Sequence, residues 1–120
     1  MAYFINHTNH PSSRWSEAQK AAARAYGQIK DLPFPEIPPE ASSEEVHAMA
    51  GGAFQKIMAL HPAAVLCQGE FTYSYALIRC LEEAGVPVVA ACSARNVKEW
   101  VEQGESRKSV VFHFVQFRRY

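Results

Sequence analysis

The chain has 120 residues, of which 48% are hydrophobic, with twelve basic and twelve acidic side chains. This length and apolar content suit one domain with one core, so we treat residues 1–120 as a single domain and exclude a disordered chain. The formal net charge of zero excludes an overall electrostatic attraction to long nucleic acid or to an anionic membrane surface.

The first elements alternate between strand and helix patterns. Residues 2–6 form a short apolar and aromatic run typical of a strand, and a polar loop follows them. The segment 15–26 is rich in helix-forming residues, and Ser12 or Ser13 could cap its N-terminus. A proline-interrupted strand over 29–34 would lie near a sheet edge.

A proline-rich connector then leads to a longer helix. Ser42 or Ser43 is expected to begin this helix, which runs to Leu60 with one apolar stripe. Gly51 and Gly52 inside the helix each weaken it by ~1 kcal/mol relative to alanine. A close contact with another helix, or a kink, would explain these two glycines.

The second half of the chain predicts buried strands. Residues 63–67 and 86–92 are continuous apolar runs, typical of strands covered on both faces, and a helix over 73–84 joins them. This alternation implies an α/β fold with mainly parallel strands. The segment 96–103 fits either a helix or the first arm of a hairpin that continues into a strand over 109–117, and we favour the hairpin.

Features of the N-terminus and of the cysteines predict a cytoplasmic location. No basic, apolar leader precedes the first strand, and no segment reaches the ~20 apolar residues that cross a membrane. Cys67, Cys80 and Cys92 are odd in number and widely spaced, which fits neither a disulfide framework nor a zinc site. We therefore expect reduced thiols and no membrane partner.

Ligands of parallel α/β sheets bind beyond the carboxyl ends of the strands, where loops lead into helices. This rule selects three segments of the chain, 7–16, 68–72 and 93–96. If the strands are parallel, all three segments meet at one edge of the sheet.

The first of these segments is dense in hydrogen-bonding groups. These groups could cradle a phosphate or ribose, with a histidine as acid or base. They belong to His7, Thr8, Asn9, His10, Ser12, Ser13 and Arg14. The alternative is a solvated loop in which a serine only caps the following helix. The spacing of His7 and His10 resembles a zinc motif, but no further ligands accompany it, so we expect no metal.

The second segment places an amide and a carboxylate directly after a buried strand. Gln68 and Glu70 could contact ribose hydroxyls, and Glu70 could act as a base. Gly69 between them allows a tight turn or a close approach to a ligand. Alternatively, both polar side chains satisfy local backbone groups while Thr72 caps the next helix.

The third segment carries Ser93 and Arg95 in a loop after the last apolar strand. A guanidinium there could hold a phosphate through two hydrogen bonds and stabilise charge during phosphoryl transfer. Arg95 could instead form a structural ion pair with Glu70.

Four short motifs are similar to those of the small stand-alone ring nucleases of type III CRISPR systems. They are WSxxQ after the first loop, CQGEF after one buried strand, AACSAR after the next, and the closing VFHFVQFRRY. The resemblance implies a CARF-like, Rossmann-like three-layer fold with a C-terminal antiparallel edge strand or hairpin. It also implies a homodimer that binds a cyclic oligoadenylate second messenger, such as cyclic tetra-adenylate, and cleaves it without metal or cofactor through the ribose 2′-hydroxyl.

The resemblance transfers roles onto the three segments already selected. Catalysis would involve His10, Ser12, Glu70 and Arg95, and ligand binding would involve Asn9, Ser13, Trp15, Gln68, Gly69, Thr72 and Ser93. Trp15 or Tyr73 could stack on an adenine. Two alternatives remain open: a non-catalytic sensor of the same ligand, and a nucleoside or nucleotide-sugar enzyme with Glu70 as nucleophile.

Overall fold

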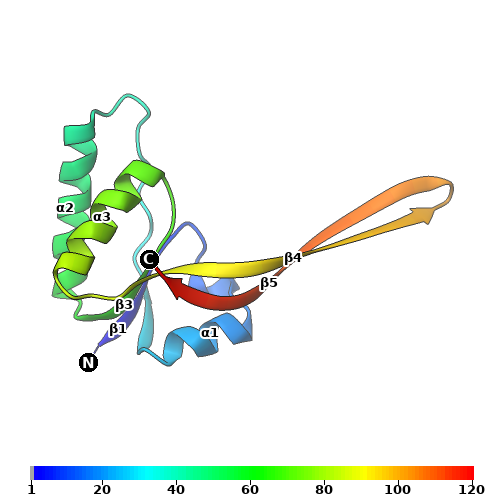
Figure 1. Ribbon diagram of the computed structural model, residues 1–120, viewed down its shortest axis with the longest axis horizontal. Helices are drawn as coiled ribbons and strands as arrows, with labels where there is room; N and C mark the ends of the chain where they lie inside the picture. Colours follow the sequence, from blue (N-terminus) through cyan, green and yellow to red (C-terminus); the bar gives the residue numbers. More distant parts are fainter. Residues whose placement is uncertain (1) are drawn as a thin grey trace.

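Five strands form one curled sheet in the order β2-β1-β3-β4-β5 in the computed structural model, which describes residues 2–120 (Figure 1). The strands are β1 Tyr3–His7, β2 Gln28–Asp31, β3 Pro62–Cys67, β4 Val88–Glu102 and β5 Glu105–Arg119. β1 pairs in parallel with β2 and β3, β3 pairs in parallel with β4, and β4 and β5 are antiparallel. The predicted α/β class with a mainly parallel sheet and a C-terminal hairpin is confirmed.

The helices are η1 Ser12–Arg14, α1 Glu17–Arg24, α2 Ser43–Ala59 and α3 Phe71–Glu83. Ser42 caps α2 in a capping box with Glu45, as the sequence pattern predicts. The predicted start of α1 is wrong, because residues 12–14 form a 3-10 turn and the Ser16 side chain caps the helix instead. The alternative in which Thr72 caps α3 is also wrong, because the N-cap of this helix is Glu70, whose side chain accepts a hydrogen bond from the Tyr73 backbone N–H.

Alternate residues of the central strands bury their side chains in two apolar clusters. Side chains of α2 and α3 form one cluster with Ile5, Val65 and Val88. The other cluster contains Phe4, Trp15, Ala23, Ala64, Leu66 and Val89, with Phe117 of β5 packed against it. The continuous apolar runs of β1 and β3 are thus explained by burial on both faces.

Two local predictions need correction. β2 ends at Asp31, before Pro33, because proline cannot donate a ladder hydrogen bond. No atom lies within 4 Å of a Cβ built on Gly51 or Gly52, so neither glycine serves a close helix contact.

The hairpin of β4 and β5 extends far beyond the rest of the sheet (Figure 1). β3 pairs only with Val88 and Val89 of β4. Beyond Val89, β4 pairs with β5 alone. Residues 93–96 therefore belong to a strand, and the predictions of a loop there and of an alternative helix over 96–103 are wrong. The radius of gyration of 17.1 Å exceeds the about 14 Å of a compact domain of this length.

The hairpin ends in a two-residue turn at Gln103 and Gly104, whose φ angles are 52° and 77°. Positive φ at both central residues matches the twist of a tight hairpin. We call residues 93–114 of this hairpin the arm. None of the helices among residues 2–120 is both long and apolar enough to cross a membrane.

Candidate functional site

The segment after β1 is held in place by side chains at the end of that strand. The amide nitrogen of Asn6 donates to the His10 carbonyl at 2.9 Å and to the Asp31 carboxylate at 3.0 Å. The Thr8 hydroxyl donates to the Asn6 side-chain oxygen at 2.8 Å. Asn6 and Thr8 are buried, so these hydrogen bonds fix the path of the loop that carries Asn9 and His10.

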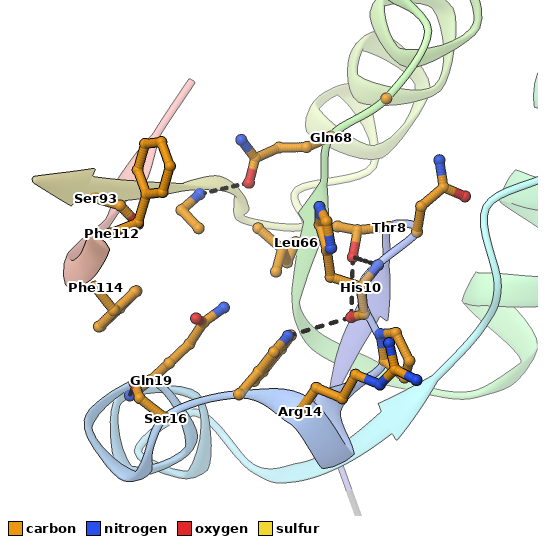
Figure 2. A pocket seen from close by; sticks show the side chains of 15 residues that line it. Thr8, His10, Arg14, Ser16, Gln19, Leu66, Gln68, Ser93, Phe112 and Phe114 are labelled. Carbon is orange, nitrogen blue, oxygen red and sulfur yellow. Dashed lines mark hydrogen bonds between the residues drawn. The ribbon is translucent and has the colours of Figure 1, made fainter. Parts of the chain in front are cut away.

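The segment after β3 is fixed in a similar way. The Gln68 side-chain oxygen accepts a hydrogen bond from the Ala91 backbone N–H of β4 at 2.8 Å (Figure 2). Gly69 lies against the buried Phe34 ring, which a Cβ at this position would overlap. The tight approach expected of Gly69 is therefore made to an aromatic ring of the protein.

A cavity of about 800 Å³ lies between these segments, α1 and the base of the arm (Figure 2). Its lining comprises Thr8, Asn9, His10, Pro11, Arg14, Trp15, Ser16, Gln19, Leu66, Gln68, Gly69, Ala91, Ser93, Phe112 and Phe114. The three segments selected from the sequence thus each contribute to one cavity. The parallel strands β1 and β3 end at the same edge, and β4 continues past this edge at Ser93.

The chemistry of the lining favours an anionic or neutral polar ligand. Of the described residues that line the cavity, only Arg14 has a formal charge, and no carboxylate is among them. Amide and hydroxyl groups of Asn9, Ser16 and Ser93 add hydrogen-bonding capacity beside the His10 imidazole. Such a set can hold a phosphate without the repulsion that a carboxylate would cause.

Aromatic side chains form the wall on the arm side. Phe112 and Phe114 of β5 face Ser16 and Gln19 across the cavity (Figure 2). Phe112 is 67% exposed, so a flat ligand has an accessible ring to stack on. Trp15 contributes to the same cavity but is only 8% exposed, and its indole N–H donates to the His10 carbonyl. Trp15 therefore braces the loop and offers less surface for stacking than Phe112 does.

The cavity contains six of the eleven residues selected from the sequence. Asn9, His10, Trp15, Gln68, Gly69 and Ser93 line it, whereas Ser12, Ser13, Glu70, Thr72 and Arg95 do not. Ser12 and Ser13 lie in the 3-10 turn, where the Ser12 N–H donates to Asp31.

Glu70 has a structural role at the start of α3. Its carboxylate accepts hydrogen bonds from the Tyr73 backbone N–H at 2.8 Å and from the Thr72 hydroxyl at 2.7 Å. These bonds, first from Tyr73 and then from Thr72, lower the pKa of the exposed Glu70 carboxyl below its ordinary value. A nucleophile or base at Glu70 would have to give up this capping interaction.

Arg95 lies on the arm rather than in a loop. It is directly opposite Phe112 in the antiparallel pair and is exposed. Among the described residues no ion pair joins it to Glu70. Arg95 therefore lies neither in the predicted loop nor in the predicted ion pair with Glu70.

Several lining residues are absent from the catalytic and ligand-binding roles that the resemblance transfers, although Arg14 belongs to the donor-rich segment 7–16 and Gln19 to the WSxxQ motif. Arg14 and Gln19 belong to the turn and helix after the first loop, and Phe112 and Phe114 come from the returning strand. The alternation of aromatic residues in VFHFVQF was a signal that two phenylalanines share one face. Which cavity they face depends on the β4–β5 register, which no local pattern specifies.

His7 lies outside the cavity and is buried at the end of β1. Its Nδ1 is 2.7 Å from the Leu32 carbonyl oxygen and its Nε2 is 2.8 Å from the Tyr73 hydroxyl. Because the carbonyl can only accept, Nδ1 carries the proton, and Nε2 accepts from the tyrosine. Burial lowers the pKa of His7, although the hydrogen bond to Leu32 raises it in part.

This buried histidine predicts a loss of stability in mild acid. The unfolded chain binds a proton near the ordinary value of 6.5, whereas the folded chain binds it only at lower pH. The free energy of unfolding should therefore fall as the pH drops below about 6.5, by at most about 1.4 kcal/mol per pH unit. Urea unfolding between pH 5.5 and 7.5 measures this slope.

The matched variants are His7→Gln and His47→Gln. His7→Gln should remove the pH slope, whereas His47→Gln, at an exposed position of α2, should retain it. An unchanged slope in His7→Gln would show that another group is responsible.

The three cysteines are free thiols. Burial raises the pKa of Cys67 to about 11, which makes it a poor nucleophile at neutral pH. Within residues 2–120 no group of three or more His, Cys, Asp or Glu side chains is arranged to hold a metal ion.

Comparison with known proteins identifies the family of this chain. The model of the family described as "Uncharacterized protein MJ1673 family" matches residues 2–118. No curated protein and no solved structure matches the chain.

Proposed function

Because the chain belongs to the uncharacterized protein MJ1673 family, whose description specifies no activity, we propose a function from the cavity and from the motif resemblance. The protein binds a cyclic oligoadenylate, of which cyclic tetra-adenylate is the first candidate, and cleaves it without a metal ion. It would act as a ring nuclease that switches off type III CRISPR signalling. A homodimer with a CARF-like, Rossmann-like three-layer fold is part of this proposal.

One observation carries the proposal: three segments of the chain meet at a cavity that has a histidine and an arginine but no carboxylate in its described lining. Phosphodiesters need a cationic contact, and ribose and adenine need neutral hydrogen-bonding groups and a ring to stack on. Arg14, the amides of Asn9 and Gln19, and the exposed Phe112 supply these. A volume of about 800 Å³ is within the range of small-molecule sites.

The reaction needs only groups of the ligand and of this lining. The ribose 2′-hydroxyl oxygen forms a bond to the adjacent phosphorus, and the bond from that phosphorus to the 5′ oxygen breaks. The proton of the 2′-hydroxyl passes to a base, and the 5′ oxygen takes up a proton. The products are a 2′,3′-cyclic phosphate and a 5′-hydroxyl, with no external water or oxidant consumed.

We assign His10 as the proton-transfer residue and Arg14 as the phosphate contact. A histidine can accept the 2′-hydroxyl proton or donate one to the 5′ oxygen near neutral pH. A guanidinium beside the phosphate stabilises the charge that develops during the transfer. Arg14 takes the role that the resemblance implies for Arg95, because Arg14 lines the cavity of its own chain.

Incubation of the purified protein with cyclic tetra-adenylate and EDTA tests the proposal. Chromatography should show linear products with 2′,3′-cyclic phosphate ends. Unchanged ligand at stoichiometric protein would overturn the nuclease function. Binding without turnover, measured by calorimetry, would instead select the non-catalytic sensor, and the absence of binding would overturn both.

Arg14→Ala tests the phosphate contact. Loss of a charge-assisted hydrogen bond is expected to raise the dissociation constant for cyclic tetra-adenylate by about 10- to 100-fold. The matched control is Arg24→Ala, which removes an exposed arginine at the end of α1 outside the cavity lining. Equal affinities of the two variants would contradict the assignment.

The nucleoside or nucleotide-sugar enzyme requires Glu70 as its nucleophile. Glu70 is outside the lining of the cavity described above and lines a separate one with His47 and Thr72, and its carboxylate is engaged in capping α3. Glu70→Gln should lower the free energy of unfolding at neutral pH, and we expect no covalent adduct at Glu70 in the wild type. Because the pKa of Glu70 is lowered on folding, this stability difference should disappear as the pH falls through that pKa.

A further inference from the structure

The arm exposes an apolar face that continues from the wall of the cavity. Cross-strand partners lie on the same face of a two-stranded ribbon, and successive residues alternate between faces. The face that includes Ser93 of the cavity therefore has the following residues, here called the inner arm face: Ser93, Arg95, Val97, Glu99 and Val101 of β4, opposite Phe114, Phe112, Val110, Lys108 and Ser106 of β5.

Large apolar side chains on this face are open to solvent. Phe112 is 67% exposed, Val101 73%, Val97 44% and Val110 40%. A two-stranded ribbon without a third strand or a covering layer is marginally stable in water. A surface of this kind is typical of a binding site for a protein partner.

We propose that the inner arm face packs against the inner arm face of a second copy of this chain, with the two arms antiparallel. The two-fold axis passes between the cross-strand pair of Val97 and Val110 and the same pair of the second copy. Each valine then meets its own symmetry mate at the centre of the contact. The homodimer is already part of the proposed function, and this arrangement specifies its interface. The interface is argued from the arm and is tested without ligand, so its failure can be told apart from a failure of the cleavage activity.

The charges next to this axis are complementary. A two-fold axis across the ribbon places Arg95 opposite Glu99 of the second copy, and the pair occurs twice by symmetry. On β5 the same operation places Phe112 opposite Lys108 of the second copy. In the described part of the chain neither Arg95 nor Glu99 takes part in an ion pair, so both are available.

The body of the protein excludes the parallel alternative. Trp15, Ser16 and Gln19 share the cavity with Phe112 and Phe114, so α1 and the preceding loop stand on the same side of the sheet as the inner arm face (Figure 2). Two parallel arms packed at the roughly 10 Å spacing of face-to-face sheets would bring both bodies into the same space. Antiparallel arms place the bodies at opposite ends of the contact.

The antiparallel pairing also completes the cavity. From Ser93 to Glu102 the arm spans roughly 30 Å at the rise of a strand. The two-fold axis crosses the arm midway along this length. The cross-strand pair of Val101 and Ser106 from the second copy therefore covers Ser93 and Phe114 at the mouth of the cavity. Each cavity therefore has a wall that only the second copy supplies.

A charge exchange between Arg95 and Glu99 tests this arrangement. Sedimentation velocity without ligand should give about twice the 13.4 kDa chain mass for the wild type. Arg95→Glu and Glu99→Arg should each raise the dimer dissociation constant by about tenfold or more, because like charges then face each other. The double variant should restore the dimer.

The double variant cannot restore an ion pair within one chain, because residues 95 and 99 lie four positions apart on one strand, a distance of roughly 13 Å. The control is Lys98→Glu, the same kind of charge change on the opposite face of the same strand, which should leave the dimer intact. The arrangement would be overturned by a wild type that is monomeric at a protein concentration on the order of 100 micromolar. Single variants that dimerise as well as the wild type, or a double variant that stays monomeric, would also overturn it.

Discussion

His10→Ala is expected to slow the cleavage of cyclic tetra-adenylate by about 10²- to 10⁴-fold, the usual effect of losing a positioned acid or base. The backbone carbonyl of His10 accepts hydrogen bonds from Asn6 and Trp15, and these bonds do not require the imidazole. The loop should therefore keep its path in the variant. Single-turnover rates at saturating protein, together with dissociation constants, separate the chemical step from binding.

The control for this variant is His47→Ala, an exposed histidine of α2 that is absent from the cavity lining. It should cleave at the wild-type rate. If His10→Ala loses affinity while its single-turnover rate is unchanged, His10 binds the ligand and another group moves the proton.

Gly69→Ala is expected to lower the free energy of unfolding by about 1–3 kcal/mol, the usual cost of overpacking a filled site. The added methyl group would overlap the ring of Phe34. That ring is 8% exposed and packs 4.9 Å from the Tyr73 ring and 5.3 Å from the His7 ring, centroid to centroid. Phe34 therefore cannot move away without disturbing the buried hydrogen bond between His7 and Tyr73.

Gly51→Ala makes the same chemical change with the opposite expected sign. A Cβ at Gly51 meets no atom within 4 Å, and the residue lies inside α2. Alanine should raise stability there by up to about 1 kcal/mol through its higher helix propensity. Urea unfolding of both variants measures the difference, and a stabilised Gly69→Ala would show that the ring moves freely.

The convergence of three chain segments on one cavity could be predicted because it needs only the identity and direction of the strands. Apolar runs in β1, β3 and β4, separated by helix patterns, imply parallel strands whose carboxyl ends share an edge. The position of Gln68 immediately after β3 then follows from the chain itself.

The roles of individual side chains depended on contacts that sequence spacing does not contain. Glu70 and Thr72 are two residues apart, and only the backbone path shows that the carboxylate, not the hydroxyl, caps α3. The indole of Trp15 suggested a ring on which a base could stack. In the structure it is instead buried against Phe4 and Phe117, because β5 returns beside α1.

By itself, the sequence determined the α/β class, the capping box of α2 and the edge of the sheet where polar groups gather, because hydrophobic periodicity and capping are local properties. Only the tertiary structure decided the length of β4. Residues 93–102 have no strong strand pattern of their own, and their pairing with β5 keeps them extended. That pairing removes Arg95 from the rim of the cavity, adds Phe112 to its wall and creates the exposed arm.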